Sequence, residues 1–195
     1  MRGRRLLWLD VALKTALIGL LLVAVAGPNL PQFEGKAVTA RAVVYPLAVL
    51  LVPAAWWVLA RARPVAYPYV LDILWTLPFF TDTVGNAADL YDSIDWWDDA
   101  NHFVNWAILV SAFGQFLLRF PLTRLATVGL GVGFVAVTAI LWEFAEYVTF
   151  IRNSPELETA YTDTLGDLAL GLSGSVVGAL VTASLRRGAS RAAER

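Results

Sequence analysis

The sequence contains no cysteine and little charge for its length. Its 195 residues include one histidine and one methionine, and only 16% of them are charged. The lack of cysteine excludes disulfides, thiolate metal sites and cysteine nucleophiles. Soluble domains usually carry about 25% charged residues. A chain with so few charges cannot cover a water-facing surface, so we expect much of its surface to face lipid.

The charges that are present nearly cancel. The chain has 15 basic and 16 acidic residues, which gives a formal net charge of −1. Nucleic-acid binding relies on many basic side chains that neutralise phosphates. Membrane lipids are therefore the expected partners, and nucleic acid is not.

The apolar residues occur in long runs. They account for 58% of the chain, and the mean hydropathy is +0.61. A helix needs about 20 mostly apolar residues to cross a bilayer. The runs predict an all-α polytopic membrane protein, with residues 1–195 forming one integral membrane domain, a bundle of six transmembrane helices. The spans are expected at roughly 6–26, 42–60, 65–80, 101–118, 125–151 and 164–185.

The basic residues predict the orientation of these spans. Cytoplasmic connections are enriched in Lys and Arg. Eleven of the 15 basic residues fall before the first span, in alternate connections, or after the sixth span. The connection from Asp82 to Asp99 has several aspartates and no basic residue, as expected of an external loop. The pattern predicts a multi-pass protein of the inner or plasma membrane with both termini in the cytoplasm.

Polar side chains recur near the predicted outer ends of the last three spans. They form three pairs at helical spacing, so each pair lies on one face of its helix. With about 1.5 Å of rise per residue, the deeper members fall within roughly 12 Å of the external interface. We expect all six residues to share a cavity open to the outer face, with Asp72 reaching its lower end. The pairs are Asp98 with His102, Glu143 with Glu146, and Asp163 with Asp167.

Such a cluster has a chemical interpretation. Ionisable residues inside a membrane are costly and are functional candidates by default. Neighbouring carboxylates repel one another unless they hold protons or a cation. Oxygen ligands with one imidazole suit Mg²⁺, Mn²⁺, Zn²⁺ or Fe²⁺. The candidate metal ligands are therefore Asp98, His102, Glu143, Glu146, Asp163 and Asp167, with Asp72 as a secondary candidate, and Glu146 or His102 is the candidate general base.

Different functions fit these residues. One is a metal-dependent membrane enzyme that acts on a lipid-linked or phosphate-bearing substrate at the outer leaflet. Another is a transporter or sensor in which the same acids bind protons or cations. A third is a structural polar network that joins three helices. The sequence leaves these alternatives open, and it does not determine the oligomeric state.

The order of the motifs resembles a known family. Asp-x-x-x-His, Trp-Glu-x-x-Glu and Asp-Thr-x-x-Asp-Leu, followed by glycines, are similar to the YjdF-like predicted inner-membrane proteins and, more loosely, to VanZ-like membrane proteins. The resemblance covers roughly the second half of the chain and implies a small bacterial polytopic membrane protein. The residues that carry it are Asp98, His102, Glu143, Glu146, Asp163, Thr164 and Asp167.

The predicted orientation can be tested on this cysteine-free chain. We expect a single cysteine at Ala193 to react with a membrane-impermeant thiol reagent only from the cytoplasmic side, because four arginines surround it in the sequence. Labelling of intact cells or sealed vesicles would measure this accessibility. Reaction at Ala193 from outside would contradict the topology.

Overall fold

The protein is described by a computed structural model that covers residues 2–149 and 151–193, with side chains described for 3–149 and 151–185. These residues form helices and connections, with no strand among them. The all-helical class expected from the sequence is confirmed. The chain divides into two compact units, Met1–Trp97 and Asp98–Arg195, and each is described by itself. The expectation of one membrane domain stays a prediction.

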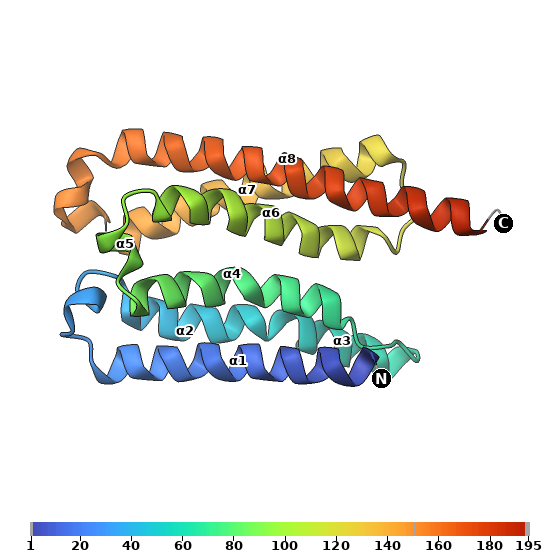
Figure 1. The fold of residues 1–195 in the computed structure, drawn as a ribbon, viewed down its shortest axis with the longest axis horizontal. Helices are drawn as coiled ribbons and strands as arrows, with labels where there is room; N and C mark the ends of the chain where they lie inside the picture. Colours follow the sequence, from blue (N-terminus) through green and yellow to red (C-terminus); the bar gives the residue numbers. More distant parts are fainter. Residues whose placement is uncertain (1, 150, 194–195) are drawn as a thin grey trace. The chain divides into compact units, whose positions relative to one another are not determined.

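Unit 1 is built around its first helix, which packs against the second and fourth helices (Figure 1). A short 3₁₀ turn, Pro31–Phe33, connects the first two of its helices. The helices of unit 1 are α1 (Arg2–Ala26), α2 (Val38–Val49), α3 (Leu51–Ala62), α4 (Tyr69–Ala87) and the short α5 (Leu90–Ser93).

α2 and α3 are two halves of one apolar segment interrupted at Leu50. Pro53 has no main-chain N–H, so it cannot donate to the carbonyl of Val49. Next to this position the Trp75 indole donates a hydrogen bond to the Ala48 carbonyl at 2.8 Å. The proline accounts for the interruption, and a side chain of α4 supplies a donor there.

Unit 2 contains three long helices, α6 (Trp97–Leu117), α7 (Arg124–Thr149) and α8 (Ala160–Ala193). α6 and α8 run in the same direction and α7 runs against them (Figure 1). Two 3₁₀ turns, Ile151–Asn153 and Pro155–Glu158, connect α7 to α8. The apolar core consists of Trp106, Val110, Val135, Ala139 and Ala179.

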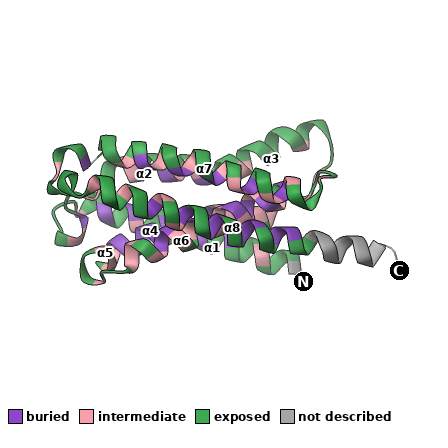
Figure 2. Cartoon of the chain, turned by 90° about the horizontal axis from the view of Figure 1, so that it is seen from above, coloured by how far each residue is buried: buried purple, intermediate pink, exposed green. Residues whose placement is uncertain are grey.

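Among the described residues, four segments are long and apolar enough to cross a membrane: Gly3–Ala26, Val38–Ala62, Arg124–Asn153 and Ala160–Leu185. α4 and α6 also have sufficient length, so their polar residues separate them from these four. Large apolar side chains are widely exposed, and α3 has no buried residue (Figure 2). An apolar surface of this extent is expected to face lipid.

The helix that contains the third expected span extends beyond the expected bounds of that span. α4 continues to Ala87, whereas the sequence indicated an end near residue 80. Polar side chains in the last turns of α4 form hydrogen bonds with main-chain carbonyls of the same helix. The Thr83 hydroxyl donates to the Phe79 carbonyl, and the Asn86 amide donates to the Asp82 carbonyl. Asp82 is therefore a buried helical residue rather than part of the external acidic loop. The side chains of Arg186, Arg187, Arg191 and Arg195, which were used to predict the orientation, lie outside the described residues.

Small residues on α8 allow α6 to approach closely. A Cβ added at Gly174 would collide with main-chain atoms of Phe103, and one added at Gly178 would collide with the Ala107 carbonyl. Close backbone approach of this kind is what small residues permit in membrane helices. The seam fixes the register of α8 against α6.

We expect Gly174→Ala to lower the free energy of unfolding by about 1–3 kcal/mol, because main-chain atoms must move to admit the methyl group. Gly133→Ala is the matched control, since its added Cβ meets nothing within 4 Å. The control should be neutral or slightly stabilising, as alanine favours helix more than glycine does. Thermal unfolding in detergent, followed by circular dichroism, measures both. Equal midpoints for the two variants would contradict the seam.

Candidate functional site

The first turn of α6 presents Asp98 to the interior of unit 2. The helix begins at Trp97, so Asp98 and Asp99 both lie where the helix dipole favours carboxylates. Asp99 is exposed, whereas Asp98 is partly buried and lies one turn before His102. Asp98 Oδ1 is 3.7 Å from His102 Nε2. The two neighbouring aspartates therefore differ in their surroundings, and only Asp98 lies near His102.

His102 joins α6 to α8. Its Nε2 is also 3.6 Å from Oδ1 of Asp167, and both of these residues are buried. The imidazole thus lies within ion-pair distance of two carboxylates, one on its own helix and one on a neighbour. A buried carboxylate needs such a partner, because its charge is otherwise poorly solvated.

α7 contributes the second pair of carboxylates. Glu143 is buried, and Thr164 of α8 lies near its carboxylate. Glu146 lies one turn later and is partly exposed. Glu143, Glu146 and His102 can each place a ligand atom so that all three atoms lie within 4.8 Å of one another.

The site therefore consists of two overlapping groups that share His102: Asp98, His102 and Asp167, and His102, Glu143 and Glu146. Within each group the ligand atoms lie within 4.8 Å of one another. Nitrogen and oxygen ligands bind Zn²⁺ at about 2.0–2.2 Å, so two ligands of one ion are at most roughly 4.4 Å apart. Small side-chain rotations would bring either group to that spacing. The donor set, one imidazole with carboxylates, fits a divalent cation.

The electrostatics of the cluster favour a cation. The charges of Asp98, Asp163 and Glu143 all act on Asp167 at close range, and they repel its negative charge. A single imidazole, even when protonated, cannot balance these carboxylates. A bound divalent ion would remove most of this repulsion.

An apolar layer lies directly beneath the polar one. Trp106 follows His102 by one turn on α6, and Gly171 follows Asp167 by one turn on α8. The Trp106 ring occupies the space where a side chain of Gly171 would project. Trp106 is part of the apolar core, so the polar cluster is confined to one end of the three helices.

Two of the predicted site residues are not brought into these groups. Asp163 is exposed in the first turn of α8, one turn before Asp167, and belongs to neither group. Asp72 lies in unit 1, where its carboxylate accepts hydrogen bonds from Lys14 and Tyr67. Lys14 also forms an ion pair with Asp10 of its own helix at 2.8 Å.

Three polar residues of unit 2 were not assigned a role from the sequence. Thr164 carried part of the family resemblance, and it lies near the carboxylate of Glu143. Asn101 is buried beside His102 in the sequence, and its side chain accepts a hydrogen bond from Asn105 at 3.0 Å. The i,i+4 spacing of Asn101 and Asn105, which is that of Asp98 and His102, could have predicted this hydrogen bond.

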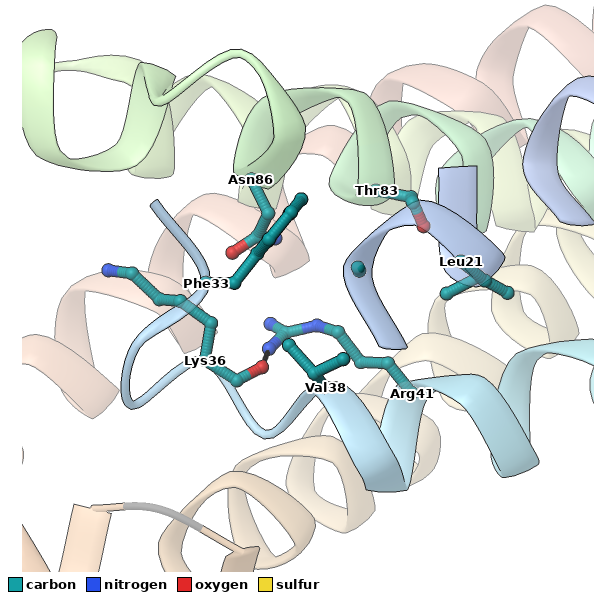
Figure 3. Close-up of a pocket in the computed structure, with 8 residues that line it drawn as sticks. Leu21, Phe33, Lys36, Val38, Arg41, Thr83 and Asn86 are labelled. Carbon is teal, nitrogen blue, oxygen red and sulfur yellow. Dashed lines mark hydrogen bonds between the residues drawn. The ribbon is translucent and has the colours of Figure 1, made fainter. Parts of the chain in front are cut away.

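Unit 1 has a polar network of its own. Asp82 accepts hydrogen bonds from Arg41 Nε at 3.0 Å, Tyr45 at 2.6 Å and Tyr91 at 3.0 Å. Beside it is a small pocket with mainly apolar walls, in which the Arg41 guanidinium reaches the Lys36 carbonyl (Figure 3). Because the donors surround Asp82 on several sides, its charge is compensated within unit 1.

Comparison with known proteins gives one match. A family model described as a predicted membrane protein (DUF2238) matches residues 12–188. No curated protein and no solved structure matches the chain significantly. The family match agrees with the expected resemblance to YjdF-like membrane proteins and gives no support to the looser resemblance to VanZ-like proteins.

We expect His102→Ala to destabilise the protein by about 1–3 kcal/mol, because it leaves the buried Asp167 without its imidazole partner. Asp99→Asn is the matched control on the same helix turn, and its exposed side chain should change the stability by less than about 0.5 kcal/mol. Thermal unfolding in detergent without added metal compares the two. A stability of His102→Ala equal to that of the unmodified protein would show that His102 is not a member of the network.

Proposed function

Because the chain belongs to the DUF2238 family of predicted membrane proteins, we propose that it is a multi-pass membrane protein that binds a divalent metal at the polar end of α6, α7 and α8. The observation that carries the proposal is the convergence of His102 with carboxylates from three helices, in two groups with ligand atoms within 4.8 Å. The ligands we propose are Asp98, His102, Glu143, Glu146 and Asp167. Asp72 is left out, since Lys14 and Tyr67 already bind its carboxylate.

The proposed topology has six spans in a bacterial inner membrane, with both termini in the cytoplasm. α4 and α6 join the four apolar segments as spans. Their polar residues are buried within each unit, as Asp72 and Asp82 of α4 and His102 of α6 illustrate. Polar residues that face a protein interior are tolerated in a membrane. This arrangement puts the metal ligands near the outer leaflet.

The proposed activity is metal-dependent chemistry on a lipid-linked or phosphate-bearing substrate at that leaflet. A bound divalent ion would neutralise phosphate oxygens and lower the pKa of a bound water. Asp167 and Glu143 are suited to be the inner ligands because they are buried. Asp98 and Glu146 are partly exposed and lie where a substrate could reach them. Glu146 or His102 would be the general base.

A second candidate function is a proton- or cation-coupled transporter or sensor. It is favoured by the 3.6 and 3.7 Å contacts of His102 with two carboxylates, which a proton alone could stabilise. A structural network would use the same contacts. These alternatives differ from the enzyme in one measurable respect, because neither requires a bound metal ion.

Metal analysis of the purified protein tests the proposal. After exposure to Zn²⁺, Mn²⁺, Fe²⁺ or Mg²⁺ and removal of free metal, we expect about one ion per chain for at least one of them. Glu143→Gln and His102→Ala should each abolish this binding, because each removes a buried ligand. Asp163→Asn and Asp99→Asn are the controls and should retain it, because both residues are exposed.

Two outcomes would contradict the metal site. One is a protein that retains none of the four ions. The other is an ion that remains bound in both Glu143→Gln and His102→Ala. Either result would favour the proton-coupled or structural alternative.

A further inference from the structure

A second set of ionisable residues lies in unit 1 and takes no part in the proposed metal site. Lys14 of α1 donates to Asp10 Oδ1 at 2.8 Å and also to Asp72 Oδ2 of α4. The Tyr67 hydroxyl, just before α4, donates to the same oxygen of Asp72. We refer to Asp10, Lys14, Tyr67 and Asp72 as the Lys14 cluster.

The two carboxylates of the Lys14 cluster are buried, and the charges of the cluster do not balance. Asp72 is 0% exposed and Asp10 is 5% exposed. With Tyr67 neutral, two carboxylates face one ammonium group, which leaves one negative charge. The other cation–carboxylate pairs of unit 1, Lys36 with Asp92 and Arg41 with Asp82, involve different carboxylates. An uncompensated charge between apolar helices is strongly unfavourable.

One carboxylate oxygen marks where the missing positive charge would go. Oδ1 of Asp72 is fully buried and has no hydrogen-bond partner among the described residues. Thr76 follows Asp72 by one helical turn on the same face of α4, is also 0% exposed, and its hydroxyl likewise has no described partner. A buried carboxylate oxygen without a donor is a receptor for a small cationic ligand.

We propose that the Lys14 cluster binds one exchangeable proton, shared by the Asp10 and Asp72 carboxyl groups, in addition to the protons of Lys14 and Tyr67. The Lys14 ammonium already occupies the position between the two carboxylates, so no multidentate cation fits there. A proton needs no further ligands, and no donor of the described residues competes with it for Oδ1 of Asp72. Lys14 is only partly buried, with 20% of its side chain exposed, and it offers a path for exchange. The chain would then contain a proton-binding site separate from its metal ligands.

Infrared spectroscopy of the full-length protein in lipid vesicles tests this proposal. At neutral pH we expect the C=O stretching band of protonated carboxyl groups to lose the area of one carboxyl in Asp72→Asn. Asp10→Asn should lose the same area, because one carboxylate and one ammonium remain in either variant and their charges balance. Thr76→Val should keep the area, because it changes neither the two carboxyl groups nor the ammonium group.

Asp89→Asn is the control and should leave the band unchanged. Asp89 is exposed, and its left-handed backbone (φ 57°) suits asparagine. The carboxyl groups of the metal site contribute equally to every spectrum and cancel in the differences, so this result does not depend on metal binding. If Asp72→Asn does not fold, Asp10→Asn decides the question.

An unchanged band in Asp10→Asn would overturn the shared proton. A band that shrinks when Na⁺ is added at constant pH would also overturn it, because an alkali ion would then occupy the site.

Discussion

The cost of placing charge among apolar helices is the constraint on which the structure depends. Three of the buried carboxylates are each contacted by a basic or imidazole side chain from another helix of the same unit. Asp72 is bound by Lys14, Asp82 by Arg41 and Asp167 by His102. Because lipid offers these groups no alternative partner, each contact also fixes which helices lie side by side. The polar residues therefore specify the helix arrangement as well as any chemistry.

Close packing of small residues sets the register in which the polar residues meet. α6 and α8 run in parallel, and Gly171, Gly174 and Gly178 allow α6 to lie against α8. Trp106 lies against Gly171 one turn after His102 and Asp167. This contact fixes α6 against α8 close to the polar pair. A shift of α8 by one residue would turn Asp167 away from the imidazole, since successive helical residues point about 100° apart.

The local features of the sequence were read correctly where they depended on spacing. Asp98 and His102 were expected to share a face, and their side chains lie 3.7 Å apart. Asp163 was expected to join Asp167 in the cluster, but it is exposed and belongs to neither group. The prediction failed at Asp82, which was assigned to a loop because polar residues follow it. In the structure those polar residues bind within α4 or to Arg41, so the helix continues past them. A criterion based on the length of apolar runs cannot detect the part of a helix whose polar side chains form hydrogen bonds within that helix or with other helices.

The sequence by itself determined the helical class, the membrane family and the candidate ligands, because helical spacing and hydropathy depend only on nearby residues. Only the tertiary structure decided which ligands meet. It grouped His102 with Asp167 of α8 and with Glu143 of α7, and it assigned Asp72 to Lys14 instead. These pairings depend on how distant helices pack and on their register, and a linear pattern of residues carries no direct record of either.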